Sequence, residues 1–164
     1  MMCSLGFLVT SFLLSPLCGW LSFPVLFVLL SYSYLKRFTF LCHAGLGVAL
    51  GLAPAGAWLA VMKEFSPGWE IPLLLGCGCA LWTAGFDVLY AIQDMDADRA
   101  ANLQSVPSRW GANKARLSAG ILHGMSLLMF FWVGFRGGFS QPYFLGVGGC
   151  LILLLLQHVL LLGG

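Results

Sequence analysis

Residues 71–98 read IPLLLGCGCALWTAGFDVLYAIQDMDAD, and this stretch decides how the rest of the chain is interpreted. The part from residue 71 to residue 86 carries no charge. A long uncharged apolar run followed at once by acidic residues predicts a membrane-spanning helix that brings carboxylates to one membrane edge. The protein has four aspartates and all of them lie here: Asp87, Asp94, Asp96 and Asp98.

The composition of the whole chain favours a membrane protein. Hydrophobic residues make up 60% of the 164 residues and charged residues only 9%, whereas a soluble domain carries about 25% charged residues. Such a chain cannot cover itself with polar surface. We therefore expect an all-α fold, a multispan transmembrane helical bundle that forms a single domain over residues 1–164, and no nucleic-acid partner. The six scattered cysteines are interpreted as small apolar residues rather than disulfides or a metal site.

About five helical segments account for the apolar runs. We expect a short run over residues 4–17, a turn within residues 17–23, and helices over residues 24–37, 42–62, 71–93, 110–135 and 143–162. Small residues at Gly47 and Gly51 predict that the second of these helices packs closely against a neighbour. The first and last apolar runs look incomplete, so the chain is interpreted as the middle part of a larger domain.

The cations predict how the bundle is oriented. Counted over alternate loops, six Lys and Arg residues lie on the same side as the aspartates, and only Lys63 and Arg136 lie on the other. By the positive-inside rule the aspartate side faces the cytoplasm. The six cations on that side are Lys36, Arg37, Arg99, Arg109, Lys114 and Arg116.

Three of the aspartates are spaced to share a helix face. Asp87 and Asp94 are two turns apart, and Asp98 continues the same face one turn later. Like charges at this distance repel one another, and a bound divalent cation removes the conflict. Mg²⁺ prefers oxygen ligands and leaves positions for water and substrate phosphate. The spacing thus predicts a magnesium site made of Asp87, Asp94 and Asp98, with Asp96 as a solvated residue.

Other interpretations of the same acids remain open. An acid inside a span marks a functional site by default, and Asp87 also fits an ion- or proton-coupled transporter. An EF-hand fails because Arg99 stands where the calcium-binding loop needs glycine. The three histidines share no helix spacing and are expected to be packed membrane residues: His43, His123 and His158.

Several residues near the aspartates are candidates for binding a phosphate. Lys36 and Arg37 end a helix on the aspartate side, either as topology signals or, for Lys36, as an ammonium that reaches a phosphate. Gln93 is placed to donate to a phosphate oxygen. Tyr90 either faces a cavity or anchors the helix at the membrane interface.

Two motifs carry a family resemblance. Asp87-x-x-Tyr90-Ala-x-x-Asp94-x-x-x-Asp98, followed by Ser105, resembles the second aspartate-rich motif of the UbiA-type intramembrane prenyltransferases. The stretch Tyr32-Ser-Tyr-Leu-Lys36-Arg37 resembles a segment that precedes this motif in the family. The resemblance covers residues 5–162 and is closest to bacterial 4-hydroxybenzoate and menaquinone-pathway prenyltransferases.

The resemblance implies a helical bundle around a central cavity, in a bacterial inner membrane, with the active site on the cytoplasmic side. By this likeness the substrates are a polyprenyl diphosphate and an aromatic acceptor of quinone biosynthesis, and the cofactor is Mg²⁺. Asp87, Asp94 and Asp98 would bind the metal. Lys36 and Arg37 would hold the diphosphate, with Asp87, Asp94 and Lys36 as the catalytic residues.

One departure from the family pattern is large. The first aspartate-rich motif of the family, an Asn-Asp-x-x-x-Asp type of sequence, is absent, because no aspartate precedes Asp87. We therefore expect the chain to be a fragment that is inactive by itself.

Overall fold

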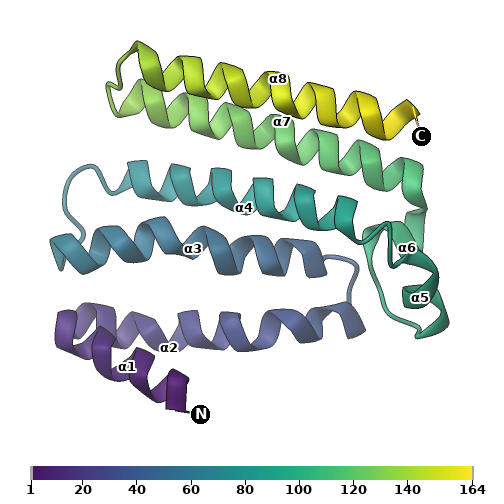
Figure 1. Cartoon of the computed structure of the whole chain (residues 1–164). Coiled ribbons are helices and arrows are strands. Elements are labelled where there is room, and N and C mark those ends of the chain that lie inside the picture. Colours follow the sequence, from purple (N-terminus) through teal and green to yellow (C-terminus); the bar gives the residue numbers. More distant parts are fainter. Residues whose placement is uncertain (1, 164) are drawn as a thin grey trace.

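The computed structural model describes residues 2–163, with side chains for residues 2–161, and every regular element within them is a helix (Figure 1). Five helical segments are long and apolar enough to cross a membrane, which confirms the predicted all-α multispan bundle. The elements in order are α1 (Met2–Leu14), α2 (Pro16–Ser31), the 3-10 helix η1 (Tyr32–Arg37), α3 (Cys42–Met62), α4 (Glu70–Tyr90), α5 (Met95–Ala100), α6 (Val106–Trp110), α7 (Ala112–Arg136) and α8 (Gln141–Gly163).

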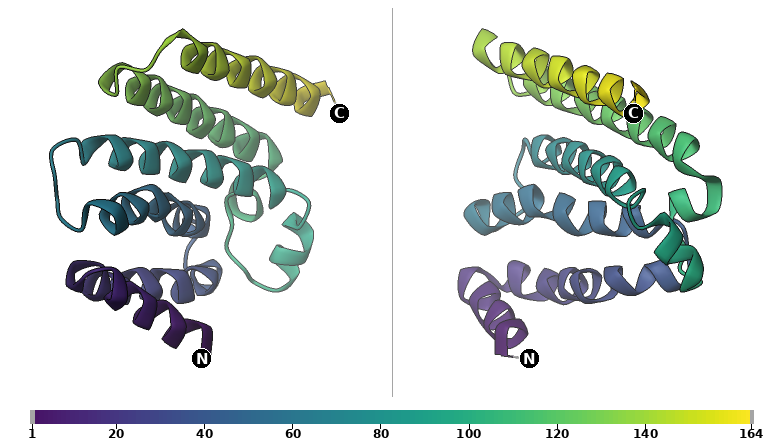
Figure 2. Two further views of the ribbon diagram at one scale, coloured as in Figure 1. Left: turned by 60° about the vertical axis from the view of Figure 1, so that its left-hand side comes forward. Right: turned by 45° about the vertical axis from the view of Figure 1, so that its right-hand side comes forward.

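The long helices lie side by side in chain order, and each runs opposite to the one before it (Figures 1 and 2). The closest packing is between α3 and α4 and between α4 and α7, while α8 packs on α7 and α1 folds back on α2. The short helices α5 and α6 connect α4 to α7 and lie together at one end of the row (Figure 1). That end also holds η1 and the start of α3, whose residues Lys36 and Cys42 both contact Gln104 in the loop before α6.

The N-terminal turn is not where the sequence pattern placed it. A turn within residues 17–23 is wrong, because the chain turns at Ser15 and α2 then runs without interruption to Ser31. The Ser15 hydroxyl accepts the Cys18 N–H at 3.1 Å, and Pro16 occupies the first helical position. A serine cap followed by proline is a strong start signal, whereas Pro24 within an apolar membrane helix is tolerated.

Glycines allow α3 and α4 to approach closely. A Cβ atom added to Gly51 would lie 2.6 Å from the Gly76 carbonyl oxygen and 2.8 Å from the Ala80 Cβ. Gly47, one turn earlier on α3, faces the Ala80 carbonyl in the same way. Backbone-to-backbone contact of this kind is what small residues provide between helices in lipid. The predicted close packing through Gly47 and Gly51 is confirmed.

Adding one methyl group at this contact is expected to destabilise the bundle. In the Gly51→Ala variant the new Cβ meets backbone rather than a flexible side chain, and overpacking of this kind costs about 1–3 kcal/mol. The matched control is Gly56→Ala in the same helix, where an added Cβ meets nothing within 4 Å. Unfolding by SDS titration in mixed micelles measures the stability of both variants. Equal stability of the two variants would contradict the close contact.

Candidate active site

A cavity of about 250 Å³ opens at the end of the bundle that holds α5 and α6. Its wall comes from three parts of the chain: η1, the start of α3, and the end of α4 with the turn after it. Two carboxylates, one ammonium and one imidazole are among the ten lining residues, which are Tyr32, Ser33, Lys36, Cys42, His43, Leu46, Asp87, Tyr90, Ala91 and Asp94.

The helix that carries the aspartates is not continuous. α4 ends at Tyr90, and the N–H groups of Gln93 and Asp94 bond to carbonyls three residues back, at 3.1 and 3.2 Å. A separate helix, α5, starts after Asp94, which occupies its N-cap position. The Asp94 side chain makes no capping hydrogen bond, and the acids in the first turn, Asp96 and Asp98, stabilise the helix start. The prediction that Asp87, Asp94 and Asp98 share one face of one helix is therefore wrong.

Asp98 is buried and already has two partners. Its Oδ1 atom lies 2.7 Å from the Lys36 Nζ, and its Oδ2 accepts a hydrogen bond of 3.0 Å from the Ser105 hydroxyl. Only 3% of Asp98 is exposed, and it does not line the cavity. Within the described residues, no three His, Cys, Asp or Glu side chains are placed to hold a metal ion. The predicted three-carboxylate site is thus not assembled, and only Asp87 and Asp94 share the cavity wall.

Asp87 has a partner that the sequence did not indicate. Its Oδ2 lies 2.6 Å from Nδ1 of His43, a residue that is 4% exposed. The other ring nitrogen of His43, Nε2, accepts the Val106 N–H at 3.2 Å. From the sequence, His43 was expected to be a packed membrane residue, because its contact with Asp87 joins different helices and no spacing within one helix reveals it. The available signal was its position at the start of a span, on the membrane side that Asp87 occupies.

Lys36 connects the cavity to the segment after α4. Its side chain is 32% exposed and lines the cavity while it pairs with Asp98. Its carbonyl oxygen accepts the Gln104 N–H at 2.7 Å, which holds the loop before α6 against η1. Lys36 is thus held both at its backbone carbonyl and at its ammonium group.

The other predicted phosphate ligands are placed differently. Tyr90 lines the cavity, is 57% exposed, and stacks on Phe86 with ring centroids 6.1 Å apart. Arg37 and Gln93 are exposed and lie outside the cavity wall. The Arg37 guanidinium instead lies 5.7 Å from the ring centroid of Tyr34.

The start of α6 supports both Asp87 and Asp98. Ser105 caps α6: its hydroxyl accepts the Ser108 N–H at 3.2 Å and donates to Asp98. The next residue, Val106, donates its N–H to His43, which in turn contacts Asp87. Val106 is also part of the buried cluster that joins α4, α6 and α7, with Val88, Ala115 and Ala119. Ser105, the N-cap of α6, therefore binds Asp98 directly, and Val106, the first residue of α6, holds the His43 partner of Asp87.

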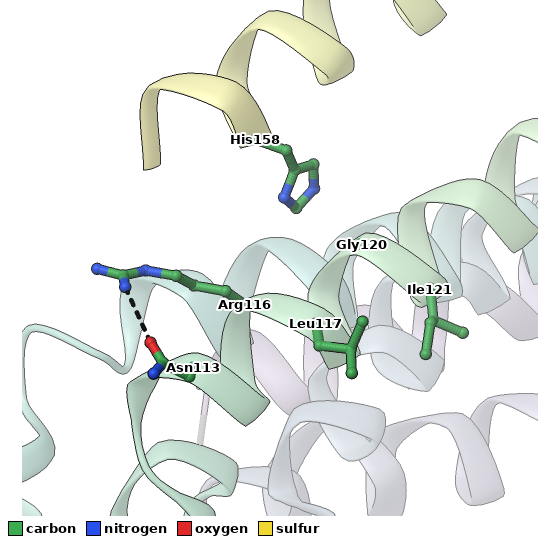
Figure 3. A pocket seen from close by; sticks show the side chains of 6 residues that line it. All are labelled: Asn113, Arg116, Leu117, Gly120, Ile121 and His158. Atoms are coloured by element: carbon green, nitrogen blue, oxygen red, sulfur yellow. Dashed lines mark hydrogen bonds between the residues drawn. The ribbon is translucent and has the colours of Figure 1, made fainter. Parts of the chain in front are cut away.

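A larger cavity, of about 430 Å³, lies between α7 and α8 (Figure 3). Arg116 is its only charged lining residue, and one of its guanidinium nitrogens donates to the Asn113 side-chain oxygen at 3.3 Å. The remaining lining residues are Leu117, Gly120, Ile121 and His158. This cavity has no carboxylate and is therefore a poorer match to a metal–phosphate site than the one near Lys36.

Comparison with known proteins agrees with the helical bundle. A sequence profile described as the UbiA prenyltransferase family matches residues 1–163. A 4-hydroxybenzoate octaprenyltransferase of Alcanivorax borkumensis is 35% identical over 148 residues, which is 90% of this chain and 50% of the relative. The enzyme of the same name from Nitrosococcus oceani is 31% identical over 82% of this chain and 46% of its own length.

A solved structure shares the fold. The apo structure of a UbiA homolog from Aeropyrum pernix superposes with a TM-score of 0.87 at 30% identity, covering 98% of this chain and 60% of the homolog. The chain thus spans about half the length of the curated relatives it matches.

Proposed function

Because the chain belongs to the UbiA prenyltransferase family, we propose that it forms part of an active site that transfers a polyprenyl group from a polyprenyl diphosphate to an aromatic acceptor in quinone biosynthesis. The relatives named 4-hydroxybenzoate octaprenyltransferase support an acceptor like 4-hydroxybenzoate. The observation that carries the proposal is the cavity at which Lys36, Asp87 and Asp94 converge from η1, α4 and the turn after α4.

Asp87 and Asp94 fit a divalent cation. Both line the cavity, Asp87 keeps 32% of its side chain exposed, and Asp94 is exposed. Two carboxylates suit Mg²⁺, which is commonly held by one or two carboxylates together with substrate phosphates. A bound Mg²⁺ would neutralise charge on the diphosphate as it leaves. Asp98 is not part of this revised set, because Lys36 and Ser105 hold its carboxylate.

Lys36 is the proposed diphosphate ligand. Its ammonium lines the cavity from η1, whereas the acids come from α4 and the turn after α4. A compact positive charge of this kind suits a phosphate oxygen. Charge builds up on the diphosphate as the allylic C–O bond breaks, and a fixed cation stabilises it more than the ground state. Leu46, Ala91 and Tyr90 give the wall apolar surface that limits access of water to the prenyl cation.

The cations and the missing motif bear on where the site lies in the membrane and on whether the chain is active alone. The membrane edge with Lys36 and the aspartates is proposed to face the cytoplasm of a bacterial inner membrane, because it collects six of the eight cations. The family's other aspartate-rich motif has no counterpart before Asp87 in this chain. We therefore expect the isolated 164 residues to show no measurable turnover, and the gene product that contains both motifs to be active.

Removal of metal tests the function directly. The gene product that contains this chain is incubated in vesicles with a prenyl diphosphate, 4-hydroxybenzoate and Mg²⁺, and the prenylated acid is measured by chromatography. EDTA is expected to abolish product formation, and added Mg²⁺ to restore it. Product formation that persists in EDTA would contradict the metal role. A proton or cation flux that depends on Asp87 and tolerates EDTA, without product, would favour a transporter instead.

A further inference from the structure

His43 is the one imidazole on the wall of the proposed active site, and it joins three helices. It lies at the start of α3, contacts Asp87 near the end of α4, and accepts a hydrogen bond from the first residue of α6. The side chain is 5% exposed, so these contacts are made away from water. A buried polar ring with both nitrogens engaged is fixed in orientation as well as in position.

The hydrogen bonds define which ring nitrogen carries the proton. The Val106 N–H is a donor, so Nε2 must accept and carries no proton. A neutral imidazole with an unprotonated Nε2 has its proton on Nδ1, and Nδ1 therefore donates to the Asp87 Oδ2 at 2.6 Å. The backbone of α6 thus sets the tautomer that contacts the carboxylate.

Since Asp87 is a proposed metal ligand, we propose that His43 is a positioning residue that holds the Asp87 carboxylate in the orientation that receives a divalent cation. This inference rests on the proposed function and adds a residue to it. Because the imidazole occupies Oδ2, Oδ1 is the oxygen left to bind a cation. A hydrogen bond to the far oxygen of a ligating carboxylate also limits its rotation, and partners of this kind affect metal affinity strongly.

The first test measures metal affinity on the 164-residue chain in detergent, with Mn²⁺ as an EPR-visible probe. His43→Leu fills the space but donates nothing, and we expect its Mn²⁺ affinity to fall about 10- to 100-fold. His43→Gln keeps a donor near Asp87, so most of the affinity should return. His158→Gln, a change of histidine far along α8, is the control and should bind Mn²⁺ as the unmodified chain does.

A second variant keeps the imidazole and removes the N–H that bonds to it. Val106→Pro deletes the N–H that bonds to His43 Nε2, and proline is accepted at the first position of a helix. Affinity for Mn²⁺ should fall less than in His43→Leu. In ¹⁵N-histidine-labelled protein, the His43 signals, identified by their loss in His43→Gln, should report a protonated Nδ1 in the unmodified chain and mixed tautomers in Val106→Pro.

The possible results distinguish failure of the His43 role from failure of the Asp87 metal site. If the unmodified chain binds Mn²⁺ and His43→Leu, folded by circular dichroism, binds it equally well, His43 is a packing residue and the inference fails. A protonated Nε2 in the NMR spectrum would overturn it as well. If the unmodified chain binds no Mn²⁺, the metal role of Asp87 in the proposed function fails first, and the role of His43 fails with it.

Discussion

In the gene product that contains both aspartate-rich motifs, replacement of Asp94 by asparagine is expected to lower prenyl transfer about 10²–10³-fold, the usual size of the loss when one group aimed at developing charge is removed. Asp94 is exposed on the cavity wall in the turn between α4 and α5, so its carboxylate is accessible to a bound cation. Asparagine preserves the size of the side chain, and no capping hydrogen bond is lost because the Asp94 side chain makes none to α5. The loss would therefore reflect the missing charge rather than a disrupted turn.

The control for this substitution lies two residues away. Asp96 is 92% exposed, and its nearest cation is Arg99 at 3.7 Å on the same short helix. Exposed pairs of this kind contribute little to stability. Initial rates at saturating prenyl diphosphate should be unchanged in Asp96→Asn and reduced in Asp94→Asn. Equal losses would mean that the acidic segment acts through its net charge and that Asp94 is not a ligand.

Local patterns in the sequence were enough to predict the spans from residue 42 onward, whereas the predicted helix over residues 24–37 corresponds to α2, which begins at Pro16 and ends at Ser31, and to η1. The helices over residues 42–62 and 71–93 correspond to α3, which has the same limits, and to α4, which ends three residues earlier. Length and apolar composition determine where a chain crosses a bilayer, and both are readable without knowledge of neighbours. The Gly47 and Gly51 contact was also predictable, because close approach in lipid depends on residue size at one helix face.

The partners of the aspartates were not predictable in this way. A seven-residue spacing places Asp87 and Asp94 together only if the helix continues, and it stops at Tyr90. The contacts of Asp98 with Lys36 and of Asp87 with His43 join segments that are far apart in the chain. They depend on how α5 and α6 fold back over η1 and α3, which is a property of tertiary packing. Buried charges acquire their partners at that level.

The last prediction concerns Lys36, which has a structural and a proposed chemical role. Lys36→Met removes the cation from the cavity and is expected to reduce transfer by about 100-fold or more. It also leaves the buried Asp98 carboxylate with Ser105 as its remaining partner. Removal of one member of a buried ion pair costs about 3–5 kcal/mol, so this variant alone does not distinguish lost chemistry from lost folding.

The double variant Lys36→Met, Asp98→Asn separates the two roles. Neutralising both members removes the unpaired charge, and an asparagine oxygen still accepts the Ser105 hydroxyl, so stability in SDS titration should recover most of the loss. Transfer should stay as low as in Lys36→Met, because the cavity still lacks its ammonium. Adding Asp98→Asn would then reverse most of the stability loss of Lys36→Met but leave the loss of transfer as it was. This result is expected when a pair shares one structural contact and only one member meets the substrate. Recovery of transfer together with stability would show that Lys36 acts only by holding Asp98, and that the diphosphate is bound by other residues.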